Sequence, residues 1–189
     1  MTTASRVTYP LLSRRSPARY LWGVIPILLG LPALLAVGSV AVEGRLGVGT
    51  VFGHPAVRVA GAIVLAVGLL LWLWSPILLL RRGRGIPIED KDGPVFDGGT
   101  KNLVCTGPYR HTRNPMYTGY LSTIAGVGIL IDSPILVLVV VPAWFLWTYT
   151  FVVRYEERAL RARFGTEYER YCRNVRRFLP RLTPWDPTA

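Results

Sequence analysis

The chain has 189 residues, 51% of them hydrophobic and 17% charged, and a formal net charge of +11 at pH 7. The apolar content excludes an intrinsically disordered chain, and the charged fraction is below the roughly 25% of ordinary soluble domains. Two cysteines, Cys105 and Cys172, exclude a scaffold of several disulfide bonds, and the length fits a single domain covering residues 1–189.

The apolar residues form four blocks with the charges between them. In chain order the blocks cover about residues 20–42, 59–80, 116–131 and 134–153. A helix needs roughly 20 apolar residues, with about 17 to 25 as the usual range, to cross the hydrocarbon core of a bilayer. Only the third block is slightly short. Four such blocks leave too little polar chain to cover them, so the sequence predicts an all-α polytopic membrane protein with about four transmembrane helices.

The first block has a signal peptide as its alternative, because Arg14, Arg15 and Arg19 precede it. Its apolar stretch exceeds the roughly 7–15 residues of a signal h-region, and Pro26 and Pro32 fit kinks in a retained helix. We therefore expect a first membrane span.

The basic residues are sorted to one side of these spans. Of the 22 Lys and Arg residues, 20 precede the first block, lie in the loop 81–114 or follow the fourth block. By the positive-inside rule this side, with both termini, is cytoplasmic, and we expect the inner (plasma) membrane of the cell. Topology and attraction to anionic lipid explain the basic excess, so we expect no nucleic-acid partner. Both cysteines lie on the reducing side and are expected to be free thiols.

The two long cytoplasmic segments are the loop 81–114 and the tail 154–189. The loop has turn signals and hydrophobic anchors, which favour an ordered, functional loop. In the tail, the fourth helix is expected to continue to Gly165, where a capping box formed by Thr166 and Glu169 starts an amphipathic helix. Its apolar face carries Tyr168, Tyr171, Cys172 and Val175, and packing on the membrane surface or over the loop both remain open.

Two segments can carry chemistry. In the first, Asn114 and Pro115 predict a helix start, and Arg113 adds a fixed charge beside its free N–H groups, which suits a carboxylate or phosphate. The alternative is that Arg110 and Arg113 only set topology or contact lipid headgroups. The sequence has no ligand set for a metal, and His54 is expected to be a loop residue.

The second segment places Glu156 and Glu157 at the end of the fourth block, with Arg154 expected on the same helix face as Glu157. The alternative is a surface ladder of ion pairs that includes Glu157 and Arg161. Only residues 132–134 separate the third and fourth blocks, which predicts a tight helical hairpin. The hairpin returns both segments to one face, where they suit a zwitterionic ligand.

These segments, in this order, resemble the isoprenylcysteine carboxyl methyltransferase family and the related phospholipid methyltransferases. The resemblance covers roughly residues 100–180 and rests on the ordered combination of motifs. The matching motifs are Gly107-Pro108-Tyr109, Arg113-Asn114-Pro115-Met116-Tyr117, Glu156-Glu157, and Phe164-Gly165 with Tyr168 and Tyr171.

The resemblance implies a membrane methyltransferase that binds S-adenosylmethionine (SAM) at the cytoplasmic side. It implies that Leu103, Val104, Gly107 and Tyr109 enclose the adenosine of the cofactor. It implies that the methionine part is held by Arg113, Asn114, Tyr117, Glu156 and Glu157. Arg154 would face the substrate as a catalytic residue. Asn114 replaces the usual histidine, and an amide can hydrogen-bond but cannot titrate.

The acceptor stays open among an isoprenylcysteine-type carboxylate, a phospholipid amine and a thiol. An amine acceptor would need a proton sink, for which Glu157 is the candidate, so it is counted with Arg154 as catalytic. The lipophilic substrate and the membrane are the expected partners, and the sequence leaves the oligomeric state open. Two other functions remain: a non-catalytic assembly or transport factor of the same fold, and a related NADPH-dependent membrane reductase.

Overall fold

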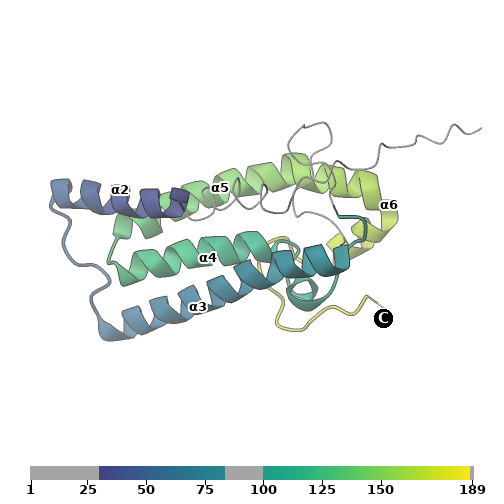
Figure 1. Ribbon diagram of the computed structural model, residues 1–189, viewed down its shortest axis with the longest axis horizontal. Coiled ribbons are helices and arrows are strands. Elements are labelled where there is room, and N and C mark those ends of the chain that lie inside the picture. The colour runs from purple at the N-terminus through teal and green to yellow at the C-terminus, as the bar shows by residue number, and fades with distance from the viewer. Residues whose placement is uncertain (1–29, 84–99, 188–189) are drawn as a thin grey trace, which may run out of the picture.

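The computed structural model describes residues 30–83 and 100–187, and every regular element in these two ranges is helical (Figure 1). This confirms the all-α prediction for the described chain. Residues 20–29 of the first expected span and 84–99 of the loop lie outside the described residues. The elements are α2 (Leu31–Leu46), α3 (Pro55–Leu78), η2 (Leu79–Gly83), η3 (Gly107–Arg110), α4 (Pro115–Leu130), η4 (Leu136–Val140), α5 (Val141–Phe151), η5 (Val152–Glu156) and α6 (Glu157–Asn174).

Two continuous helical stretches, Pro55–Gly83 and Leu136–Asn174, are long and apolar enough to cross a membrane. In the most apolar part of each, only 11% and 17% of the residues are buried, whereas the core helix of a soluble protein would be mostly buried. The apolar part of the second stretch ends at Val153, and the charged residues from Arg154 onward lie beyond it. The first and third expected spans are not among these candidates, so the four-span topology stays a prediction.

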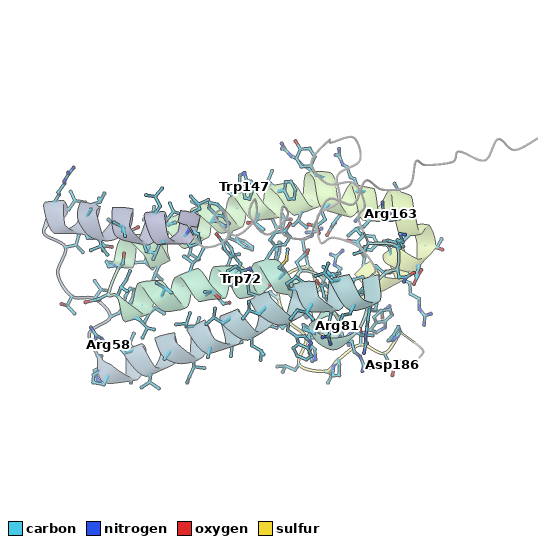
Figure 2. All side chains as sticks on the ribbon, in the orientation of Figure 1. Arg58, Trp72, Arg81, Trp147, Arg163 and Asp186 are labelled. Carbon is cyan, nitrogen blue, oxygen red and sulfur yellow. The ribbon has the colours of Figure 1, made fainter. Side chains whose placement is uncertain are left out.

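The charges lie at the ends of the helical bundle. Figure 2 shows Arg58 at one end, and Arg81, Arg163 and Asp186 at the other. This is the arrangement expected for spans with charged segments on the two sides of a membrane.

Helices α3 and α4 run antiparallel and pack through glycines. A Cβ on Gly68 would lie 2.6 Å from the backbone nitrogen of Thr123, and one on Gly119 would lie 2.5 Å from that of Trp72. A Cβ on Gly126 would lie 2.6 Å from the backbone nitrogen of Leu65. Small residues at such contacts let two helix backbones approach closely, which is a common way to pack helices in membranes.

The turn between α4 and the following helix is the predicted tight hairpin. Asp132 adopts a left-handed φ of 58°, and its Oδ1 accepts hydrogen bonds from the backbone nitrogens of Val51 at 3.0 Å and Phe52 at 2.6 Å. Glu43 of α2 is buried beside this turn, where its carboxylate accepts from Ser133 Oγ at 2.8 Å and Ile135 N at 2.7 Å. The hairpin is therefore tied to both α2 and the loop before α3.

Helix α6 bends at Gly165, which has φ 50° and ψ −125° and marks the point where the sequence predicts a helix end. Beyond the bend, Tyr168, Tyr171 and Val175 are buried against Leu103 and other loop residues. Of the two arrangements that the sequence leaves open, the helix thus packs over the loop. Its cytoplasmic location remains a prediction.

Candidate active site

The segment before α4 is held by residues 175–187, which we call the strap. The two segments run side by side. Backbone hydrogen bonds join Arg113 N to Arg176 O at 2.9 Å, Asn114 N to Arg177 O at 3.2 Å, Arg181 N to His111 O at 2.9 Å and Trp185 N to Arg110 O at 3.0 Å. Because α4 begins at Pro115, the strap fixes the approach to its first turn.

Asn114 occupies the predicted N-cap position of α4, but its side chain makes no capping hydrogen bond. Its Nδ2 instead donates to the carbonyl of Arg177 at 3.0 Å, and the hydroxyl of Thr112 donates to the same oxygen at 3.0 Å. The sequence therefore locates the helix start correctly and assigns the amide the wrong partner. The amide hydrogen-bonds to the strap, which is distant in sequence, instead of capping the helix.

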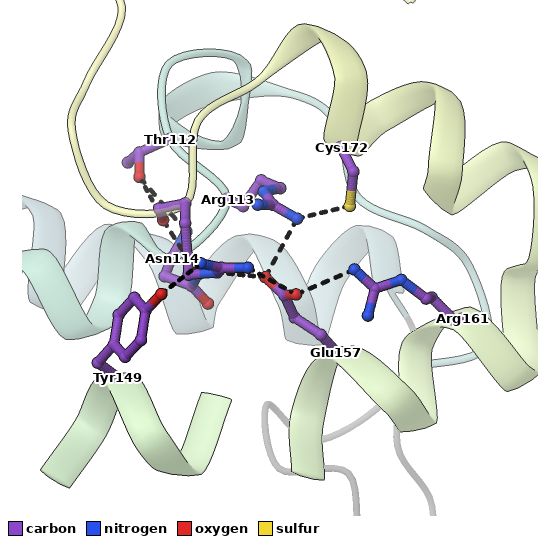
Figure 3. Close-up of polar contacts among 8 residues, drawn as sticks. Thr112, Arg113, Asn114, Tyr149, Glu157, Arg161 and Cys172 are labelled. Atoms are coloured by element: carbon purple, nitrogen blue, oxygen red, sulfur yellow. Dashed lines mark hydrogen bonds and ion pairs between the residues drawn. The ribbon is translucent and has the colours of Figure 1, made fainter. Parts of the chain in front are cut away.

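Glu157 is the centre of a buried cluster of charges (Figure 3), and only 1% of the residue is exposed. Arg113 Nη1 lies 3.1 Å from its Oε1, and Arg161 Nη2 lies 3.1 Å from its Oε2. Arg177 donates from Nε to Oε1 at 2.6 Å and from Nη2 to Oε2 at 3.0 Å. Burial alone would raise the pKa of Glu157, but the hydrogen bonds of Arg177 and the charges of the other two arginines outweigh it and lower that pKa.

The prediction that Arg154 and Glu157 lie on the same helix face is wrong. Arg154 is exposed whereas Glu157 is buried, because Val152–Glu156 forms a π-helical turn, which contains more residues per turn than an α-helix and rotates the two side chains apart. Glu157 does pair with Arg161, as the ion-pair ladder predicts. Arg161 is, however, only one of its three arginine partners, and the carboxylate lies inside the protein rather than on its surface.

A cleft opens beside this cluster, between α4, η5, α6 and the loop. Its volume is about 640 Å³ when the open space at its mouth is counted. It is lined by Leu79, Thr100, Leu103, Val104, Tyr109, Arg113, Asn114, Met116, Tyr117, Val152, Glu156, Glu157, Leu160, Tyr168 and Tyr171.

Eight of the nine residues expected to bind the cofactor line this cleft, and Gly107 does not. Gly107 has φ +59°, and a Cβ there would lie 2.7 Å from Leu78 Cδ1, so it is a close packing point of the loop on α3. Arg154, the other expected catalytic residue, is also absent from the lining.

The cleft is lined by both apolar and charged side chains. Leu103, Val104 and Tyr109 lie in the lining together with Glu156, which shares a side-chain hydrogen bond with Tyr117. Burial, followed by the charge of Glu156, raises the pKa of Tyr109, so this phenol stays neutral. Arg113 also lines the cleft, and its Nε is buried with no acceptor in the described part of the chain. That donor is available to an anionic group of a ligand.

Arg177 is the main residue that the sequence does not reveal. It holds Glu157 with two hydrogen bonds, donates from Nη1 to the hydroxyl of Tyr149 at 3.2 Å, and its carbonyl receives the Asn114 amide. In the sequence it is one of nine basic residues after the fourth block, and only contacts distant along the chain distinguish it from its neighbours. The one available signal is that a buried carboxylate needs several cationic partners.

Comparison of the sequence with known proteins identifies relatives of this chain. The family model for phospholipid methyltransferases matches residues 56–167, from the first turn of α3 to just beyond Gly165. The chain belongs to this family. Together with the outward-facing apolar helices, this membership makes it a membrane protein of a methyltransferase family.

Relatives with a name include metal-resistance proteins and a probable methyltransferase. The "Cobalt-zinc-cadmium resistance protein CzcN" of Cupriavidus metallidurans is 36% identical over 114 residues, which are 58% of this chain and 52% of that protein. The "Nickel-cobalt-cadmium resistance protein NccN" of Alcaligenes xylosoxydans xylosoxydans is 36% identical over 91 residues, 47% of this chain and 42% of that protein. A "Probable protein-S-isoprenylcysteine O-methyltransferase" of Oryza sativa subsp. indica is 35% identical over 79 residues, 41% of this chain and 40% of that protein.

The chain thus spans about half, or less, of the length of these relatives. No solved structure is significantly similar to it. The family is therefore established by sequence.

Proposed function

We propose that the protein transfers the methyl group of SAM to a lipophilic acceptor at the membrane. The observation that carries this proposal is the cleft, in which one wall offers the buried Arg113 Nε and the other offers the Glu156 carboxylate. SAM carries an amino-acid group with both charges and an adenosine, so the charged and the apolar side chains of the lining suit its two parts. Family membership supports the same reaction class.

Within the cleft, we assign the carboxylate of the cofactor to Arg113 and the first turn of α4, and its ammonium group to Glu156. The adenosine is assigned to the part of the cleft lined by Leu103, Val104 and Tyr109. Glu157 is a poor choice for the ammonium group because its two oxygens already accept from three arginines. Its proposed role is positional: it holds Arg113 at the wall of the cleft.

When bound, SAM supplies a methyl group on a sulfonium sulfur, which leaves as a neutral thioether when the acceptor attacks the carbon. The protein then has to align the acceptor and exclude water. A carboxylate or thiolate acceptor needs no base. An amine acceptor needs a group that takes up a proton, and the arginines that lower the pKa of Glu157 make it unsuited to this task. The site therefore favours an oxygen or sulfur acceptor.

A row of aromatic side chains supports a lipid-soluble acceptor. Along α5 and η5, ring centroids are separated by 5.3 Å between Trp144 and Trp147, 5.8 Å between Trp147 and Phe151, and 5.7 Å between Phe151 and Tyr155. Trp147 and Tyr155 are exposed, and the row ends next to Glu156 of the cleft. We propose that the acceptor arrives along this face and that the exposed Arg154 orients it, with the cleft on the cytoplasmic side.

The test is calorimetric titration of the purified protein with S-adenosylhomocysteine, followed by mass spectrometry of membrane extracts incubated with methyl-labelled SAM. We expect saturable binding that Arg113→Ala weakens at least tenfold. Arg158→Ala, which removes an exposed arginine of α6, is the matched control and should bind normally. Absence of binding to the wild type, or equal binding by both variants, contradicts the proposal.

The names of the two metal-resistance relatives favour one alternative, a non-catalytic role in a membrane system. Such a protein would retain affinity for S-adenosylhomocysteine and label no compound in any extract. In the described ranges, no group of three or more His, Cys, Asp or Glu side chains lies close enough to hold a metal ion.

A further inference from the structure

A second pocket lies behind Arg113, where α6 ends and the strap begins. Including its open mouth, its volume is about 760 Å³. It is lined by Arg113, Cys172, Arg173, Asn174, Val175, Arg176 and Arg181. We call it the arginine pocket, because four of its seven lining residues are arginines and none is acidic.

Much of its positive charge is uncompensated. Arg173 and Arg176 are exposed, and neither forms an ion pair with any residue that the structure describes. The side chain of Arg181 donates to the carbonyl of Asn174, a neutral acceptor. A cation near the last turn of α6 is favoured by the helix dipole, which accounts for Arg173 but not for the convergence of arginines from the strap.

Arg113 forms the wall between this pocket and the cleft. Its side chain is 9% exposed, and it contacts Glu157 on one side and the sulfur of Cys172 on the other. Arg113, Arg173, Arg176 and Arg181 thus line one hollow, with Arg113 buried and Arg173 and Arg176 exposed.

The pocket also lies at a defined level of the bundle. Its residue Arg176 accepts a hydrogen bond from Arg113 N at 2.9 Å, and α4 starts two residues later at Pro115. If α4 enters the membrane from its first residues, as the hairpin predicts, the pocket is at the height of the lipid headgroups. Its mouth is then exposed to phosphate groups, and guanidinium binds phosphate through paired hydrogen bonds.

We propose that the arginine pocket binds the phosphate group of an anionic lipid headgroup. Arg173 and Arg176 supply the guanidinium groups at the mouth, and Arg113 lies at the floor. The assignment uses the predicted membrane topology but is independent of methyl transfer, and it holds for any acceptor in the cleft.

The experiment is native mass spectrometry of the full chain in detergent, titrated with dioctanoyl phosphatidylglycerol or dioctanoyl phosphatidylcholine. We expect saturable retention of the anionic lipid and weak retention of the zwitterionic one. Arg173→Gln and Arg176→Gln should each weaken phosphatidylglycerol binding about fivefold, the effect of one basic residue near a charged membrane surface. Arg158→Gln, which removes an exposed arginine of the same helix outside the pocket, should not.

Equal retention of both lipids, or equal weakening by all three variants, overturns the proposal. A competition experiment with inorganic phosphate distinguishes a lipid from a free anion. If phosphate displaces the lipid at comparable concentration, the pocket recognises a free oxyanion and the lipid assignment fails. Titration of the same variants with S-adenosylhomocysteine separates this proposal from that of the cleft. Arg173 and Arg176 do not line the cleft, so we expect their binding of S-adenosylhomocysteine to be unchanged.

Discussion

Arg177 holds the buried Glu157 with two parallel hydrogen bonds, Nε to Oε1 at 2.6 Å and Nη2 to Oε2 at 3.0 Å, across 20 residues of chain. This geometry joins the strap to the start of α6. Because Glu157 also holds Arg113, a residue outside the cleft controls the position of a residue inside it.

Replacing Arg177 by alanine should therefore destabilise the protein and weaken binding of S-adenosylhomocysteine. We expect a loss of about 2 kcal/mol, the typical magnitude for hydrogen bonds to a charged group. Arg177→Lys should recover only part of it, because an ammonium group cannot reproduce the paired geometry. Thermal unfolding in detergent and calorimetry are the measurements, with Arg158→Ala as control. An unchanged melting temperature would show that Arg113 and Arg161 alone are enough to stabilise the buried Glu157 carboxylate.

The two adjacent glutamates should respond differently to the loss of charge. Glu157→Gln removes the partner of three arginines, so we expect a lower melting temperature together with weaker binding of S-adenosylhomocysteine. Glu156→Gln should weaken that binding about tenfold or more, as expected for one charge-assisted hydrogen bond, with a smaller effect on unfolding. The two variants are compared by calorimetry and thermal unfolding. The opposite order would assign the ammonium group to Glu157.

The glycines between α3 and α4 provide a test of the fold. Gly68→Ala would place a Cβ 2.6 Å from the backbone nitrogen of Thr123, so the helices must separate, at a cost of about 1–3 kcal/mol. Gly38→Ala is the matched control, since a Cβ on that α2 residue meets nothing within 4 Å. Alanine favours a helix over glycine, so the control should be neutral or slightly stabilising. Equal melting temperatures for the two variants would mean that α3 and α4 pack less closely than described.

The thiol of Cys105 should be unreactive at ordinary pH. Burial, followed by the charge of Glu167, raises its pKa from 9.0 to about 12. A raised pKa keeps the thiol neutral, and the thiolate is the nucleophile, so at pH 8 the reactive fraction is about a thousandfold below that of a free cysteine. Iodoacetamide labelling of the Cys172→Ser variant, followed by peptide mass spectrometry, should show slow modification that rises with pH up to about 12. Fast labelling in the native state, matching that in denaturant, would contradict this burial.

Local signals in the sequence predict much of the fold and of the cleft. The Asn114-Pro115 pair locates the start of α4, and the short 132–134 linker predicts the hairpin, because both depend on neighbouring residues. Most of the cleft lining is predicted by the resemblance to the methyltransferase family, which rests on the ordered combination of motifs. The role of each side chain is harder to predict.

The predictions that fail depend on geometry or contacts that spacing does not encode. Arg154 was expected beside Glu157 on the assumption of α-helical periodicity, and the π-helical turn changes that register. The Asn114 amide donates to the carbonyl of Arg177 in the strap, more than 60 residues further along the chain. The contacts of Arg177 likewise join segments that are distant in sequence. Neither contact has a local sequence signal.

Arg113 lines both the cleft and the arginine pocket, so the two hollows share a single guanidinium group. An anion in the pocket lowers the positive potential at this group and thereby weakens its attraction for a carboxylate in the cleft. Thermodynamic linkage makes the effect reciprocal: a ligand in the cleft must weaken anion binding by the same factor. If both proposals hold, the composition of the surrounding bilayer then becomes a variable in the affinity of the cleft for SAM.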